Sequence, residues 1–231
     1  MMISVIIPVL NEAENLKRLL PYLKKISDDN TEIMVCASAE STDESEDICK
    51  ENDVRYLQTI AADRAIQMNA GAESSHGDVL CFLHADVVPP VQFIGHITNA
   101  VCQGYKFGIF AYRFDSPEKC LAINAWFTQR KGVFSGGGDQ IHFVERQLFY
   151  ALGKYDEQCG FMEDFRFFSK VKAHNVDYCI VNDTAVVSAR KYITNSYVRV
   201  NIANLFIFIL FRLGVSGKEL KKMYKKWLNP Y

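Results

Sequence analysis

Asp86 stands where a carboxylate could hold a metal ion. It follows an apolar run that ends at Leu83, and a carboxylate just past a buried strand can bind a divalent cation that bridges a diphosphate. An aspartate in the turn before Pro89 and Pro90 needs no such role. The position leaves two explanations open: a ligand for Mn²⁺ or Mg²⁺, and a turn residue.

Glu163 and Asp164 place two acids at the start of a segment with helical periodicity. A partly desolvated carboxylate is a suitable general base. Acids near a helix N-terminus also stabilise the helix dipole and accept hydrogen bonds from free amides, without any chemistry. The pair is a candidate for proton transfer, with a helix cap as the alternative.

Arg64 begins a predicted helix beside a strand end, where helix amides and a guanidinium both favour phosphate. An ordinary exposed arginine explains the position equally well. The glycines at 136–138 would let the backbone approach a ligand or would simply permit a turn. Four histidines lie in no metal-ligand spacing and are assigned no role: His76, His96, His142 and His174.

Composition and missing motifs exclude several classes of protein. Hydrophobic residues make up 49% and charged residues 23%, as in a soluble globular domain, and a net charge of −1 gives no reason to expect nucleic acid as a partner. Seven cysteines without a C-x-x-C pair indicate reduced thiols in a cytoplasmic protein. No G-x-G-x-x-G follows the first strand, and no G-x-x-x-x-G-K-[ST] loop occurs, which disfavours dinucleotide oxidoreductases and phosphate-loop kinases.

Alternating strands and helices must position these side chains. The predicted strands of the first half are Ile3–Val9, Glu32–Ala37, Val54–Gln58 and Asp78–Leu83. The predicted helices are one capped by Asn11 with Glu14 three residues later, then Asp43–Asn52, Asp63–Glu73 and Pro89–Gln103. This order predicts an α/β fold with a doubly wound, mostly parallel sheet, whose ligands bind beyond the carboxyl ends of the strands.

The second half is less regular. We expect a strand with one exposed face at Phe107–Asp115, and further strands at Ile141–Val144, Tyr178–Val181 and Ala185–Ser188. Helices are expected at Cys120–Lys131 and Glu163–His174. The opening residues have no basic region or cleavage site and predict a first strand, not a signal peptide. The domain is assigned to residues 1–194, with a helical tail over 195–231.

The tail combines an apolar segment with a basic one. Its longest apolar run, Ile202–Phe211, is too short to span a bilayer. Five lysines follow: Lys218, Lys221, Lys222, Lys225 and Lys226. A basic amphipathic helix after an apolar one suits an anionic lipid surface. Packing on its own domain, or on a second copy in a homodimer, is the alternative.

Six ordered blocks resemble the family-two glycosyltransferases of the GT-A fold, and within them a bacterial subgroup, the radical-SAM/selenodomain-associated transferases. Ser4–Glu12 resembles the first strand and nucleoside turn of that family, and Arg64–Gly71 most of its G-R-A-R-Q-M-N-x-G helix. The other blocks are Ser41-Thr42-Asp43, Phe82-Leu83-His84-Ala85-Asp86, Gly138-Asp139-Gln140 and Met162-Glu163-Asp164. The tail residues 212–216 are also similar to the subgroup.

The resemblance implies an inverting transfer of a glycosyl group, of hexosyl type, from a UDP- or GDP-type sugar to an unknown hydroxyl acceptor. It implies that Asp164 is the general base, with Glu163 in support, and that Asp86 binds Mn²⁺ or Mg²⁺. The implied nucleotide-sugar contacts are Pro8, Leu10, Glu12, Ser38, Arg64, His84 and Ala85. The implied acceptor-side residues are Gly138, Asp139 and Gln140.

Two departures from the family pattern keep alternatives open. Ser38 replaces an aspartate that bonds the nucleoside, and the helix motif has Asp63 for Gly and Ile66 for Arg. A catalytically weakened relative that only binds a nucleotide is therefore one alternative. A nucleotidyltransferase is the other, although its glycine-rich loop after the first strand is missing. The expected location is the cytoplasm, with the inner face of the membrane as a site of peripheral contact.

Overall fold

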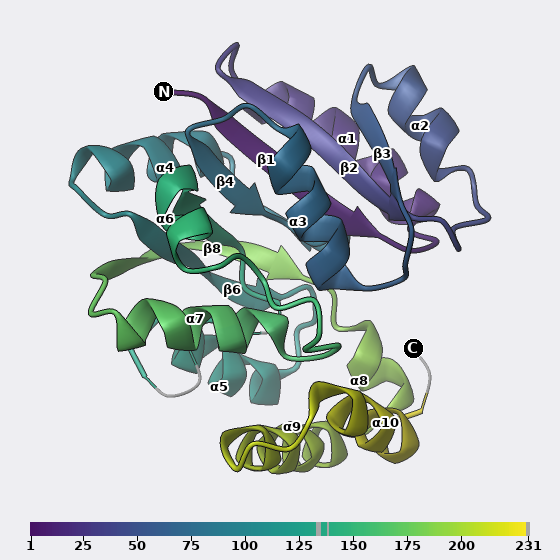
Figure 1. Cartoon of the computed structure of the whole chain (residues 1–231). Helices are drawn as coiled ribbons and strands as arrows, with labels where there is room; N and C mark the ends of the chain where they lie inside the picture. The colour runs from purple at the N-terminus through teal and green to yellow at the C-terminus, as the bar shows by residue number, and fades with distance from the viewer. Residues whose placement is uncertain (133–134, 138, 230–231) are drawn as a thin grey trace.

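The computed structural model describes residues 1–132, 135–137 and 139–229. Strands in this part of the chain form one curled sheet of order β3-β2-β1-β4-β7-β6-β8-β5 (Figure 1). Their bounds are β1 Ile3–Val9, β2 Thr31–Ser38, β3 Arg55–Thr59, β4 Val79–Phe82, β5 Val87–Val88, β6 Phe107–Phe114, β7 His142–Glu145 and β8 Tyr178–Val187. The helices are α1 Ala13–Ile26, α2 Ser45–Glu51, α3 Arg64–Ser74, α4 Phe93–Cys102, α5 Lys119–Thr128, α6 Arg146–Ala151, α7 Glu163–Ala173, α8 Arg190–Thr194, α9 Tyr197–Arg212 and α10 Gly217–Trp227.

The first four long strands form the predicted parallel half of the sheet. β1 pairs in parallel with β2 and β4, and β2 pairs in parallel with β3. β7 then runs antiparallel between β4 and β6, and β8 runs parallel to β6. As a result β8 ends at the same edge of the sheet as β1 and β4. This edge gathers the polar residues that follow three separate strands.

Successive side chains of β1 point to opposite faces of the sheet and belong to two different core clusters. One core cluster joins Val5 and Ile7 to Leu16 and Leu20 of α1, and includes residues of α2 and α4. The other joins Ile6 to Ala65, Met68 and Ala72 of α3, and includes residues of α6 and α7. The continuous β-branched run of β1 is thus explained by helices on both faces, as expected for a doubly wound sheet.

β6 differs from its sequence-based prediction. A strand with one exposed face was expected at 107–115, yet its first five residues are all buried. The reason is its place in the sheet, because β7 and β8 flank it and helices cover both faces. β8 is also one strand where two were expected, because its pairing with β6 continues through a register shift between Phe110 and Tyr112.

The caps of the first helices also differ from the prediction. Asn11 does not cap α1: it adopts a left-handed conformation (φ 56°), and its Oδ1 accepts a hydrogen bond from Thr42 N at 2.8 Å. Asp43 caps instead, accepting from Ala13 N at 2.7 Å and from Ser45 N at 3.2 Å. One carboxylate therefore closes the starts of both α1 and α2. α4 begins at Phe93 and not at Pro89.

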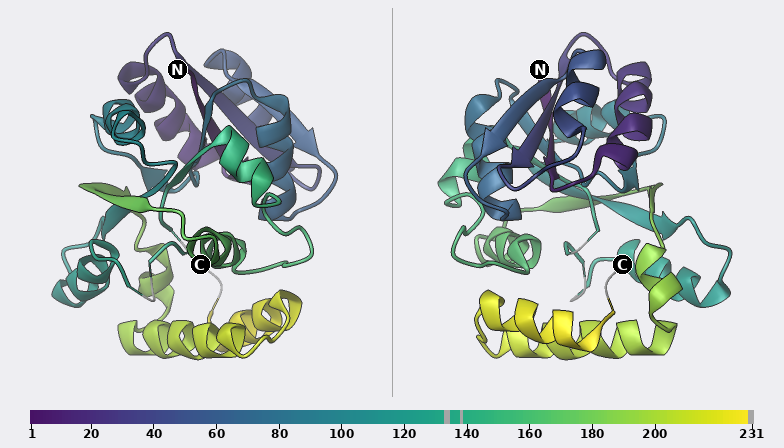
Figure 2. Two further views of the ribbon diagram at one scale, coloured as in Figure 1. Left: turned by 60° about the vertical axis from the view of Figure 1, so that its left-hand side comes forward. Right: turned by 90° about the vertical axis from the view of Figure 1, so that its right-hand side faces the viewer.

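The tail helices pack on the domain. Figure 2 shows α9 and α10 side by side as a layer at one end of the molecule, with α8 leading into them. Val200 and Ala203 of α9 are fully buried, in a cluster with Leu228. A side chain at Gly217 would collide with the backbone of Cys159 and Phe161, so α10 is tied to the loop before α7. No helix in the described ranges is long and apolar enough to cross a bilayer.

The close packing of α3 on the sheet gives a stability prediction. A Cβ atom at Gly71 would lie 2.5 Å from Ile6 Cγ2 and 2.6 Å from Cys36 Sγ. Gly71→Ala should therefore lower the free energy of unfolding by about 1–3 kcal/mol. Gly95→Ala, at an exposed position of α4 where the nearest atom is 3.5 Å away, should raise it by about 0.5–1 kcal/mol. Urea unfolding measures both; a Gly71→Ala variant as stable as wild type would contradict the packing.

Candidate active site

An ion cluster joins the ends of β1, β4 and β8. Nη2 of Arg190 lies 3.0 Å from Asp86 Oδ2 and 3.3 Å from Glu12 Oε1. Ser188 N also donates to the carbonyl of Asp86 at 3.4 Å. One arginine thus holds two carboxylates from neighbouring parallel strands in fixed relation. We name Glu12, Asp86 and Arg190 the strand-edge cluster.

The pKa of the Asp86 carboxyl is raised although two arginines lie nearby. Burial raises the pKa of the Asp86 carboxyl, and the nearby Asp139 raises it further. The guanidinium groups of Arg190 and Arg64 lower it, but the net shift is upward. A further cation beside Asp86 would favour the ionised form of this carboxyl.

The residues present fit a divalent cation held jointly with a ligand. Among the described residues, no three His, Cys, Asp or Glu side chains converge as a complete metal-binding group. Asp86 would supply one hard oxygen ligand, and diphosphate oxygens and water would have to supply the others. This is a donor set that Mg²⁺ or Mn²⁺ uses with nucleotides.

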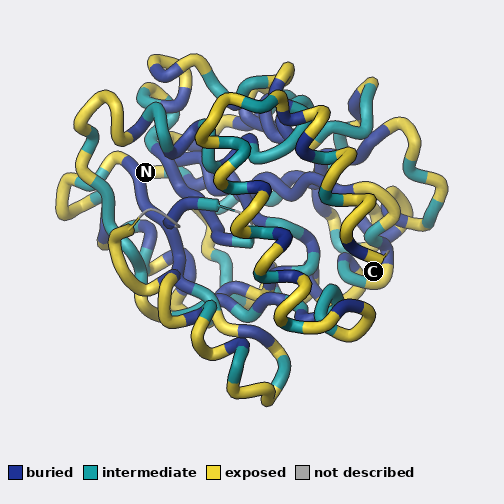
Figure 3. The backbone as a smooth tube through the Cα atoms, turned by 90° about the horizontal axis from the view of Figure 1, so that it is seen from below, coloured by how far each residue is buried: buried dark blue, intermediate teal, exposed yellow. Residues whose placement is uncertain are grey.

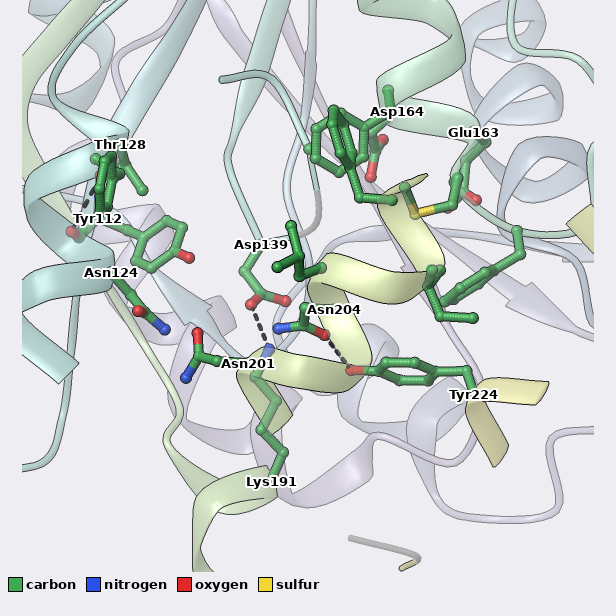
Figure 4. Close-up of a pocket in the computed structure, with 18 of the residues that line it drawn as sticks. Tyr112, Asn124, Thr128, Asp139, Glu163, Asp164, Lys191, Asn201, Asn204 and Tyr224 are labelled. Atoms are coloured by element: carbon green, nitrogen blue, oxygen red, sulfur yellow. Dashed lines mark hydrogen bonds and ion pairs between the residues drawn. The ribbon is translucent and has the colours of Figure 1, made fainter. Parts of the chain in front are cut away.

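A cavity of about 460 Å³ lies between the domain and the tail. Its polar lining comes from both parts, as Figure 4 shows: Asp139, Glu163 and Asp164 from the domain, and Asn201, Asn204 and Tyr224 from α9 and α10. Tyr224 Oη donates to Asn204 Oδ1 at 2.9 Å. The tail therefore completes the site, a role that its own sequence pattern does not reveal.

Glu163 and Asp164 begin α7 at the wall of this cavity. Each is only 6% exposed, and the preceding Met162 adopts a left-handed conformation (φ 64°) that turns the chain into the helix. Burial raises the pKa of Asp164 well above its usual range, and the Glu163 carboxylate adds to the shift, against the opposing effect of Arg64. A buried carboxyl with a raised pKa is a candidate for proton transfer.

Arg64 connects the cavity with the strand-edge cluster. It lies at the start of α3 and lines the cavity, where it keeps solvent-accessible surface. Although desolvation disfavours the charged guanidinium, four carboxylates raise its pKa above the usual value: Glu163, Asp164, Asp139 and Asp86. Arg64 is thus a permanent positive charge between the two groups of acids.

Of the predicted acceptor-side residues, Asp139 lines the cavity and Gln140 does not. Asp139 lines the cavity and pairs with Lys191 Nζ at 3.0 Å, and this pairing holds the pKa of the Asp139 carboxyl below its usual value despite burial. Gln140 is buried away from the cavity, with its amide bonded to Gly136 N and to Phe110 O. Gly138 lies outside the described residues.

The predicted nucleotide contacts follow the strand ends. Pro8 is buried within β1, Leu10 is exposed just after it, and Ala85 and His84 follow β4. Ser38 ends β2 but has no exposed surface, and its Oγ accepts from Glu40 N at 3.0 Å. The Ser38 hydroxyl, which stands where the family has an aspartate, is thus used in a turn of the chain itself.

Sequence reasoning missed Arg190 and Lys191. Both follow β8, and the available signal was a pair of basic residues just past a strand that ends at the same edge of the sheet as β1 and β4.

The sequence analysis also gave no role to Gln67 and Asn69. Gln67 Nε2 donates to Val9 O at 2.6 Å and to Cys36 O at 2.9 Å, which fixes α3 to the ends of β1 and β2. Asn69 Nδ2 binds Tyr155 O at 3.0 Å and so anchors the loop before α7.

The sheet, its two helical layers and the strand-edge site define a mixed α/β protein of the GT-A fold. Residues 4–144 match the model of glycosyl transferase family 2, and the chain belongs to this family. No curated protein sequence gives a significant match.

Solved structures share the fold at low sequence identity. S. aureus TarS 1–349 in complex with UDP-GlcNAc aligns with a TM-score of 0.68 and 14% identity, over 98% of this chain and 71% of that chain. Glucosyl-3-phosphoglycerate synthase from Mycobacterium tuberculosis, in complex with Mn²⁺, UDP and phosphoglyceric acid, aligns with a TM-score of 0.65 and 15% identity, over 93% and 79% of the two chains. At these coverages both alignments include part of the tail, residues 195–231.

The raised pKa of Asp164 gives a prediction on stability. An acid whose pKa is higher in the folded state favours folding at low pH, and this contribution is lost as the pH rises through the folded pKa. Asp164→Asn removes the ionisation, so the variant should melt at a higher temperature than wild type at pH 8, with a smaller difference at pH 5. Asp29→Asn, at an exposed site, is the matched control. Equal melting temperatures of the Asp164→Asn variant and wild type at pH 8 would contradict the electrostatic description.

Proposed function

We propose that the chain transfers a glycosyl group, of hexosyl type, from a nucleoside diphosphate sugar to an acceptor hydroxyl with inversion of configuration. The observation that supports this most is the placement of Asp164, a buried acid with a raised pKa, in the wall of the cavity between the domain and the tail. Asp86 belongs to the strand-edge cluster, and the Arg64 guanidinium interacts with both Asp86 and Asp164. The two carboxylates thus suit two different tasks.

The donor would bind along the carboxyl ends of β1, β2 and β4. TarS and the mycobacterial synthase are solved with UDP-GlcNAc and with Mn²⁺ and UDP, respectively, which favours a UDP-type donor here. Asp86 would hold Mn²⁺ or Mg²⁺, which neutralises charge on the leaving diphosphate when bound. Arg190 and Arg64 would donate hydrogen bonds to its oxygens, since guanidinium groups match phosphate geometry.

In the reaction proposed, the acceptor oxygen attacks the anomeric carbon of the donor while Asp164 takes the hydroxyl proton. The bond between that carbon and the diphosphate oxygen breaks, and the nucleoside diphosphate leaves with the electron pair. Glu163 orients the acceptor, and Asp139 and Lys191 line the same cavity. Attack on the face opposite the leaving group inverts the anomeric centre.

Ser38 supports a second candidate, a relative that binds nucleotides weakly. Its hydroxyl is buried and bonded within the chain, so it offers the nucleoside less than an aspartate would. The retained Asp86 and Asp164 favour chemistry over simple binding.

We further propose membership in the radical-SAM/selenodomain-associated subgroup, on the similarity of the tail residues 212–216 to that subgroup.

Replacement of the base tests the proposed function. Asp164→Asn keeps the shape and most hydrogen bonds but cannot accept a proton, so turnover should fall by about 10²–10⁴-fold. Nucleotide affinity should stay nearly constant, because the proposed diphosphate site lies at Asp86 and not at Asp164. Glu163→Gln should have a milder effect on turnover. The measurement is sugar transfer with a panel of UDP-, GDP- and dTDP-sugars in Mn²⁺, beside nucleotide affinity.

Two outcomes would contradict the assignment of Asp164. Normal turnover in the Asp164→Asn variant would show that another group takes the proton. A parallel loss of nucleotide affinity and rate would place Asp164 in the donor site. If wild type binds a nucleotide but transfers no sugar from any donor, the weak-binding relative is the correct description.

A further inference from the structure

The outer face of α9 is apolar and open to solvent. Its exposed residues follow the helical period along almost the whole helix, with exposed fractions between 39% and 75%: Val198, Ile202, Leu205, Phe206, Ile209 and Leu213. The opposite face packs Val200, Ala203 and Ile207 inside the protein. Seen from below, the end of the molecule formed by α9 and α10 carries many exposed residues (Figure 3). The six exposed residues form what we call the tail stripe.

α10 adds an aromatic group and positive charge beside the tail stripe. The Trp227 ring stacks on Phe206, with centroids 4.8 Å apart, and remains 38% exposed. A hollow in the surface is lined by Val198 and Ile202 together with Trp227, Arg199 and Lys226. The tail stripe is therefore bordered directly by cations and by an indole ring, a combination suited to the boundary between headgroups and acyl chains.

Charge is distributed very unequally between the tail and the domain. Residues 195–231 contain seven lysines and arginines and one acid, a net charge of +6. The remaining 19 basic and 26 acidic residues give residues 1–194 a net charge of −7. Four of the five lysines of α10 are exposed. The positive end of the protein is thus also its apolar end.

We propose that the tail stripe and the lysines of α10 dock on an anionic lipid surface. Apolar side chains would enter the headgroup region while lysines contact anionic headgroups, each cation contributing attraction. A second copy of the chain is the less favourable occupant, because a symmetric pair would set two surfaces of charge +6 against each other. The docking itself does not depend on glycosyl transfer, and only its consequence for an acceptor rests on the proposed function.

Docking would bring the acceptor side of the cavity to the lipid. Asn201 and Asn204 of α9 line the cavity, and Leu205 belongs both to the cavity wall and to the tail stripe. One helix therefore separates the cavity from the docking face. An acceptor carried in the lipid layer would then lie one helix away from Asp164.

Vesicle flotation of the full chain tests the docking. Wild type should float with vesicles of phosphatidylcholine and phosphatidylglycerol, much less with phosphatidylcholine alone, and less at 0.5 M than at about 0.1 M salt. The double variant Ile209→Glu/Leu213→Glu should lose binding by more than about tenfold. Neither residue lines the cavity. Val91→Glu, at an exposed valine far from the tail in sequence, is the matched control and should bind like wild type.

Three outcomes would overturn the proposal. Wild type could fail to bind anionic vesicles, or the double variant, shown to be folded by its thermal unfolding, could bind as well as wild type. Light scattering could show a wild-type dimer that the same double variant converts to a monomer, which would assign the tail stripe to a second copy. Loss of sugar transfer with intact flotation would count only against the proposed activity.

Discussion

The contact of Arg190 with both Asp86 and Glu12 is the interaction on which the candidate site depends. It joins the ends of β1 and β4 to the segment after β8, and the next residue, Lys191, pairs with Asp139 in the cavity. The chain then enters α9, which carries Asn201 and Asn204 into the same cavity. Two adjacent cations therefore connect the strand edge with the cavity, and each offsets an acid that burial would otherwise penalise.

The tail serves two surfaces at once because α9 is apolar on two sides. Its inner side packs on the domain and lines the cavity with Phe208 and Ile207, while its outer side exposes the tail stripe. A helix that is apolar on nearly all sides must bury both sides against protein or place one of them against lipid. Gly217 allows α10 to approach the loop before α7, so the position of the tail and that of Asp164 are mechanically linked.

Local sequence patterns predicted the parallel half of the sheet well. The bounds of β1 are those expected, and the acids at Glu163 and Asp164 do begin a helix. β6 was assigned an exposed face because its neighbours β7 and β8 are distant in sequence, and alternation alone cannot show that both faces are covered. Arg190 was missed for a similar reason, since its role arises only when β8 is placed parallel to β6 and ends at the ligand edge. The tail's part in the cavity rests on tertiary contacts that no local pattern encodes.

Calorimetric titration with UDP and GDP tests the strand-edge cluster as a diphosphate site most directly. Wild type should bind one of them more tightly with Mn²⁺ than with EDTA. Asp86→Ala should remove this gain if, as proposed, the carboxylate is the protein's ligand to the metal. Arg190→Gln should weaken binding in EDTA and keep the gain, because in the proposed complex the guanidinium contacts the diphosphate itself. Unchanged, EDTA-insensitive binding in Asp86→Ala, or full metal-free affinity in Arg190→Gln, would contradict the account.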